Sequence, residues 1–124
     1  FAETASEAAF HAKEQLNAPG LETLLELDDA AFRIMFAGSP VKRSGRDRFI
    51  RNVLIAAGNS GEARLCGKIL PLLDDGSALV RAMAVWALSE LGLELGDPDI
   101  WSREKARRSG LEDDPDVLAE WRAD

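Results

Sequence analysis

The sequence predicts an all-α fold of roughly six or seven helices. Along most of the 124 residues, apolar side chains recur at three- and four-residue spacings, the period of a helix buried on one face. No segment alternates apolar and polar residues for long enough to predict a strand. Capping residues and helix breakers divide the chain into short segments. Apolar residues make up 46% of the chain, which is enough for one core.

The N-terminal third reads as three short helices. Residues 2–16 are rich in Ala and Glu and predict a first helix, which residues 17–20 (Asn-Ala-Pro-Gly) end. Residues 21–27 place four leucines on a second helix. Asp28 is positioned to cap a third, with Phe32 and Phe36 four residues apart on one face. Residues 38–40 (Gly-Ser-Pro) then break the chain.

From Gly45 the helical pattern becomes regular. A helix over 45–58 is followed by one over 63–73, in which Pro71 predicts a kink or an early end. Ser77 caps the next helix, and two weaker helices follow Asp97, the second capped by Asp114. The predicted inward residues of the two longest helices are Phe49, Ile50, Val53, Leu54 and Ala57, then Leu79, Val80, Met83, Ala84, Ala87, Leu88 and Leu91.

An internal repeat relates these two helices. Residues 50–58 align with residues 80–88 at an offset of 30, each beginning with a β-branched residue and Arg. This pattern resembles HEAT-like repeats, which are stacked antiparallel helix pairs. It predicts a helical lead-in over 1–41, a repeat core over 42–92 and a helical tail over 93–124, together one compact domain. Arg81 is expected to form a structural ion pair between repeats, whereas Arg51 could do the same or bind a ligand. Asn52 and Asn59 are expected in turn and cap roles.

Positive charge is concentrated in one short segment of an acidic chain. The net charge is −7, and residues 1–29 and 90–124 each contribute −6. Residues 42–51 carry +4, from Lys42, Arg43, Arg46, Arg48 and Arg51 against one acid. These cations follow a chain break and enter a helix N-terminus, an arrangement suited to phosphate. The alternative is a solvated or salt-bridged face.

Several kinds of chemistry are excluded by composition. Cys66 is the single cysteine and His11 the single histidine, so this chain alone cannot build a zinc site or a four-thiolate cluster. No nucleophile and base are paired, so no catalytic residue is predicted. Asp74-Asp75 and Asp113-Asp114 precede helices, and capping accounts for both pairs. No apolar run is long enough to cross a membrane.

A longer set of motifs resembles one family. Several segments are similar to the C-terminal region of epoxyqueuosine reductases, which are cobalamin- and iron–sulfur-dependent enzymes of queuosine synthesis in tRNA. These segments are residues 32–36, 38–43, 45–52 and 58–59, the Val80-Arg81 helix start and residues 114–121. The resemblance implies a cytoplasmic parent oxidoreductase whose cobalamin and 4Fe-4S clusters lie upstream of Phe1. The chain itself is then expected to hold no cofactor.

The resemblance also implies a partner. It favours tRNA, through the anticodon arm, as the ligand of Lys42, Arg43, Arg46, Arg48 and Arg51, with no role for DNA or membrane. The upstream catalytic domain of the same chain is the second expected partner. The alternative function is a scaffolding or protein-interaction module that makes no RNA contact.

Overall fold

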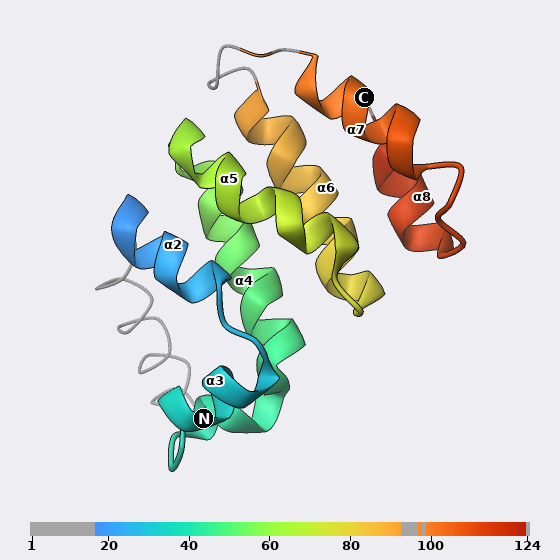
Figure 1. The fold of residues 1–124 in the computed structure, drawn as a ribbon. Coiled ribbons are helices and arrows are strands. Elements are labelled where there is room, and N and C mark those ends of the chain that lie inside the picture. Colours follow the sequence, from blue (N-terminus) through green and yellow to red (C-terminus); the bar gives the residue numbers. More distant parts are fainter. Residues whose placement is uncertain (1–16, 93–96, 98, 124) are drawn as a thin grey trace.

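The computed structural model describes residues 17–92, 97 and 99–123, and within them every regular element is helical (Figure 1). The all-α prediction is therefore confirmed, and the described residues contain seven α-helices. The predicted helix over 2–16 and His11 lie outside the described residues. The α-helices and the short 3-10 helices are α2 (Ala18–Leu25), α3 (Asp29–Met35), η1 (Pro40–Ser44), α4 (Gly45–Asn59), η2 (Ala63–Leu65), α5 (Cys66–Ile69), η3 (Leu70–Asp74), α6 (Ala78–Gly92), α7 (Ile100–Arg108) and α8 (Pro115–Trp121).

Helices α4 and α6 form the centre of the molecule. They pack against each other more extensively than any other described pair and run in roughly the same direction in Figure 1. Helix α2 packs on α4, and α8 packs on α6, so one apolar cluster extends from Ala18 to Trp121. The aligned positions Ile50 and Val80 are both fully buried, as are Leu54 and Ala84. The stacking of helix pairs as a HEAT-like repeat stays a prediction.

Local capping signals place most helix starts. Asp28 Oδ1 accepts a hydrogen bond from the Ala31 amide at 2.8 Å, and Ser77 Oγ accepts one from Val80 at 3.4 Å. Residues 17–20 differ from the expectation of a helix end, because they begin α2. Asn17 caps it by accepting from the Gly20 amide at 2.8 Å, and Pro19 lies in the first turn, where a missing N–H costs nothing.

The inward face of α6 differs from the predicted one. Leu79 is 42% exposed and Met83 only half-buried, whereas Val85 is almost fully buried. The reason is that α6 has neighbours on several sides, with α4, α8 and η3 all packed against it. A helix enclosed in this way buries a wider arc than a single-face pattern predicts.

The predicted 63–73 helix is divided into three short pieces. The α-helical part ends at Ile69, and η3 carries Pro71 in its first turn. Proline has no N–H and its ring clashes with the preceding turn, which explains the early end. The expected effect of Pro71 is confirmed.

One close approach fixes the crossing of the central helices. Gly58 lies inside α4, and a Cβ added there would lie 2.4 Å from a ring carbon of Trp86 in α6. Gly58 therefore provides room for the indole rather than a turn. No described helix is long and apolar enough to pass through a membrane.

Candidate nucleic-acid interface

A tight turn presents the basic residues at one end of the molecule. Gly38 adopts φ +77°, a conformation that favours glycine, and Ser39 caps η1 by accepting from the Val41 amide at 3.2 Å. Lys42 and Arg43 lie on η1, and α4 follows directly, beginning at Gly45. The break at residues 38–40 is therefore followed by a short 3-10 helix that leads directly into the long helix α4.

Three of the five candidate cations are exposed and have no acidic partner. Lys42, Arg43 and Arg48 are exposed, and Arg51 is half-exposed. Among residues 17–92, 97 and 99–123, no ion pair joins any of these four to a carboxylate. An open groove of about 500 Å³ passes between Lys42, Arg43 and the residue 38–40 turn. We call Lys42, Arg43, Arg48 and Arg51 the basic strip.

The N-terminus of α4 adds positive potential to this strip. Ser44 precedes the helix but supplies no side-chain cap, because its hydroxyl donates to the Val41 carbonyl at 2.9 Å. The first N–H groups of α4 therefore lack a side-chain acceptor. They and the helix dipole favour a negative group at the same end as the exposed cations.

Arg46 behaves differently from the other four. Its side chain is only 12% exposed, and its Nε donates to the Leu27 carbonyl at 2.9 Å. Its Nη1 contacts Asp75 Oδ1 at 2.9 Å and Asp47 Oδ1 at 3.1 Å. Arg46 is thus held within the protein and is not available to a phosphate as the strip residues are.

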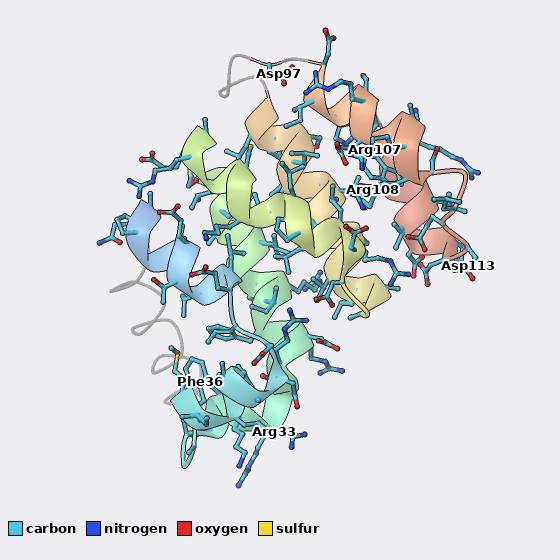
Figure 2. All side chains as sticks on the ribbon, viewed as in Figure 1. Arg33, Phe36, Asp97, Arg107, Arg108 and Asp113 are labelled. Carbon is cyan, nitrogen blue, oxygen red and sulfur yellow. The ribbon has the colours of Figure 1, made fainter. Side chains whose placement is uncertain are left out.

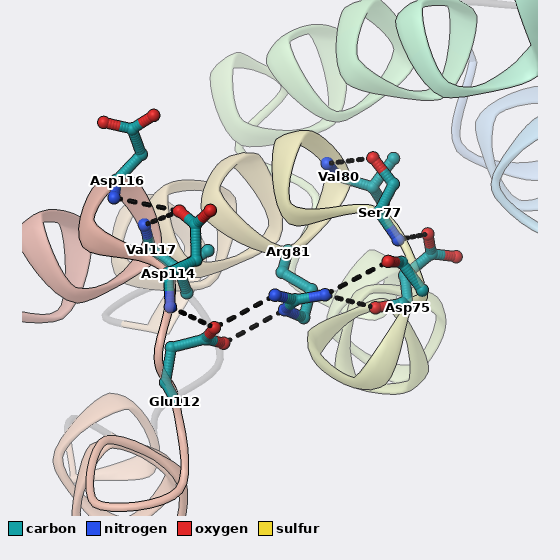
Figure 3. A network of polar contacts seen from close by, with 9 residues as sticks. Asp75, Ser77, Val80, Arg81, Glu112, Asp114, Asp116 and Val117 are labelled. Atoms are coloured by element: carbon teal, nitrogen blue, oxygen red, sulfur yellow. Dashed lines mark hydrogen bonds and ion pairs between the residues drawn. The ribbon is translucent and has the colours of Figure 1, made fainter.

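Arg81 occupies the position aligned with Arg51 and is fully engaged. It pairs bidentately with Glu112 at 3.0 and 2.9 Å and donates to the Asp75 carbonyl at 2.9 Å (Figure 3). This contact lowers the pKa of Glu112 and raises the pKa of Arg81. Asn52 lies on the exposed side of α4, and Asn59 is the last residue of that helix. Neither amide side chain forms a hydrogen bond with another described residue.

An exposed apolar pair on α3 was not predicted from the sequence. Ile34 is 80% and Met35 48% exposed on α3, next to Arg33, which pairs with Asp29 at 3.0 Å. The signal was available, because Phe32 and Phe36 point inward and so force Ile34 outward. Figure 2 shows Arg33 and Phe36 at the α3 end, away from Arg107 and Arg108.

A rigid aromatic cluster supports this end of the molecule. Phe32, Phe36 and Phe49 have ring centroids 4.8 to 5.5 Å apart, in tilted pairs. They join the α3 segment to α4, the helix that carries Arg48 and Arg51. The strip is therefore attached to a packed base rather than to a free loop.

The described residues do not fit an iron–sulfur cluster. They contain no group of three or more His, Cys, Asp or Glu side chains that could hold a metal ion. Cys66 is buried among apolar residues, and burial raises the pKa of its thiol. One inward-facing thiol cannot hold an iron–sulfur cluster, so no chemistry of such a group is assigned to this chain.

Three curated relatives share extensive sequence with this chain, and each is named epoxyqueuosine reductase. The protein from Xanthomonas campestris pv. campestris is 36% identical over 94 residues, covering 75% of this chain and 26% of the relative. The protein from Alicycliphilus denitrificans is 36% identical over 98 residues, covering 73% and 27%. The protein from Vibrio cholerae is 37% identical over 60 residues, covering 48% and 16%.

The chain spans about a quarter of the length of the first two relatives. No family model and no solved structure matches it. The similarity confirms the resemblance predicted from the sequence motifs, and the chain fits a C-terminal fragment of the epoxyqueuosine reductase family.

Proposed function

We propose that this chain binds tRNA through the anticodon arm and positions it for a catalytic domain located elsewhere in a longer, cytoplasmic oxidoreductase. The observation that supports this most directly is the basic strip. Lys42, Arg43 and Arg48 are exposed and lack acidic partners in the described part of the chain, although the chain as a whole is acidic. Exposed, uncompensated cations beside a helix N-terminus are what phosphate oxygens require.

The charge distribution favours a single landing site. Segments of −6 at both ends repel a polyanion, whereas the strip attracts it. Arginines elsewhere are largely neutralised within the protein. Arg64 pairs with Glu22, Arg103 with Asp97, and Arg108 with Glu104. RNA approaching this domain would therefore be directed to the α3–η1–α4 end.

The proposal assigns binding, and no chemical step, to these residues. Reduction of the epoxide, with the cobalamin and 4Fe-4S clusters implied by the resemblance, would belong to the upstream domain. The role of this chain is orientation, which contributes to a rate by holding the reacting groups together.

Binding of a fluorescein-labelled anticodon-arm RNA hairpin by the full 124-residue chain tests the proposal. Replacing Lys42, Arg43 and Arg48 with Gln should weaken binding by about tenfold or more, since three phosphate contacts are lost. The matched control replaces Arg64, Lys68 and Arg122 with Gln, which removes the same charge elsewhere. Equal losses in both triple variants would indicate a general charge effect and no site at the strip.

A protein-interaction module is the second candidate. The observation in its favour is the exposed pair Ile34 and Met35, which a protein partner would cover. In that case the strip contacts a partner surface, such as the upstream domain, and the hairpin does not bind to the unaltered chain.

A further inference from the structure

Arg46 links three segments that lie far apart in the sequence. It belongs to the first turn of α4, its Nε donates to Leu27 in the α2–α3 connection, and its Nη1 contacts Asp75 before α6. The side chains of Arg46 and Asp75 are 12% and 14% exposed. Such a shielded, multidentate contact is far more rigid than an exposed ion pair.

Asp75 is itself fixed from several directions. Its Oδ2 accepts from the Ser77 amide at 3.0 Å, and its carbonyl accepts from Arg81 at 2.9 Å. Arg81 continues to Glu112, which also accepts from the Asp114 amide at 3.0 Å (Figure 3). A continuous series of polar contacts therefore runs from the start of α4 to the cap of α8.

We infer that Arg46 is a positioning residue for the RNA interface: its contacts with Leu27 and Asp75 fix the start of α4, and thereby the basic strip, without touching RNA. This inference rests on the proposed function. Arg46 lies close to the strip in sequence: η1 ends at Ser44, two residues before Arg46, and Arg48 lies two residues after it. A groove of about 380 Å³ lined by Arg46, Arg48, Ser77 and Leu79 also places the starts of α4 and α6 side by side.

The carboxylates of Asp47 and Asp75 beside Arg46 allow a test in which the two possible roles of Arg46 predict opposite changes in RNA affinity. If Arg46 contacts phosphate directly, Asp75→Asn frees it and removes a negative charge, so RNA binding tightens. If Arg46 positions the strip, Asp75→Asn loosens the contact, and binding weakens although the protein becomes more positive. Asn retains an oxygen for the Ser77 amide, so the turn before α6 is preserved.

Asp47→Asn is the matched control. It makes the same charge change next to Arg46, but the Asp47 side chain is 54% exposed and contributes only one contact. We expect Asp47→Asn to leave hairpin affinity equal or tighter and Asp75→Asn to weaken it by roughly tenfold. Arg46→Lys should weaken binding as Asp75→Asn does, because one ammonium cannot reproduce the Nε and Nη1 contacts together.

Thermal unfolding monitored by circular dichroism identifies any variant that has lost its fold. If Asp75→Asn or Arg46→Lys is unfolded, the RNA affinity of the other of these two variants tests the inference. Tighter binding by Asp75→Asn, or full affinity in Arg46→Lys, overturns the positioning role while leaving the proposed function intact. Absence of hairpin binding by the unaltered chain overturns the proposed function, and with it this inference.

Discussion

Some contacts between helices depend on single residues whose partners lie far away in the sequence. Gly58 has the indole of Trp86 against its Cα, and Arg46 contacts Leu27 and Asp75, 19 and 29 residues away. Neither partner can be read from local sequence, because nothing near Gly58 or Arg46 specifies which side chain will face it. The sequence predicted the end of the helix near Gly58 correctly, since α4 ends at Asn59, but it did not predict the contact with Trp86. The grouping of Arg46 with the exposed cations came from its neighbours along the chain.

Replacing Gly58 with Ala should destabilise the protein by about 1–3 kcal/mol, because the added methyl group overlaps the Trp86 ring. Gly67→Ala is the control, since a Cβ there meets no atom within 4 Å. Alanine is the better helix former, so Gly67→Ala should be neutral or slightly stabilising. Urea unfolding measures both. An unchanged urea midpoint for Gly58→Ala would contradict this, because it would show that α4 and α6 can move apart at little cost in stability.

The Arg81–Glu112 pair should make stability sensitive to acid. Its hydrogen bond lowers the pKa of Glu112 in the folded state, so this stabilisation is complete above the unfolded pKa of about 4.3. It is lost as the pH falls through the folded pKa. Stability of Glu112→Gln, from urea unfolding between pH 6 and about pH 3, should therefore decline less steeply with acid than that of the unaltered chain. Identical slopes would contradict the assignment.

Elements with a local signal were predicted well. Asp28, Ser77 and Asp114 all cap helices, since an N-cap bond spans only two or three residues and is therefore visible in sequence. The early end of α5 at Ile69 was predicted from Pro71, whereas the separate 3-10 turn of η2 was not. By contrast, the wide buried arc of α6 and the exposed Ile34–Met35 pair depend on which helices pack together, and a single helix pattern does not contain that information.

The cap of α8 offers a test at this scale. Asp114 Oδ1 accepts from the amides of Asp116 and Val117 at 2.9 and 3.1 Å. Asp114→Ala should cost about 1 kcal/mol of stability, whereas Asp116→Ala removes an exposed acid of the same turn and leaves the cap. Urea unfolding followed by Trp fluorescence includes a signal from α8, because Trp121 is buried against Trp101. Equal effects of the two substitutions would mean that the cap is not stabilising.

At the scale of the whole molecule, one core joins elements from α2 to α8. Leu54 is fully buried between the central helices, so Leu54→Asp places an unpaired charge there. The cost is comparable to the total stability of a small domain, about 5–15 kcal/mol, and the chain should unfold cooperatively. Met83→Asp is a graded comparison, because the half-buried Met83 lets the carboxylate reach water. Circular dichroism should show that Met83→Asp is folded and Leu54→Asp is unfolded. An unfolded Met83→Asp beside a folded Leu54→Asp would show that the buried faces of α4 and α6 are assigned wrongly.

The central claim is that the basic strip recognises phosphate at one end of an otherwise acidic helical domain. Its most direct test is the salt dependence of hairpin binding. The slope of log affinity against log salt concentration should become shallower by about 2 to 3 units when Lys42, Arg43 and Arg48 become Gln, at about 0.7–0.9 per phosphate contact. The Arg64, Lys68 and Arg122 triple variant should keep the original slope. A slope that is unchanged in the strip variant would contradict the account.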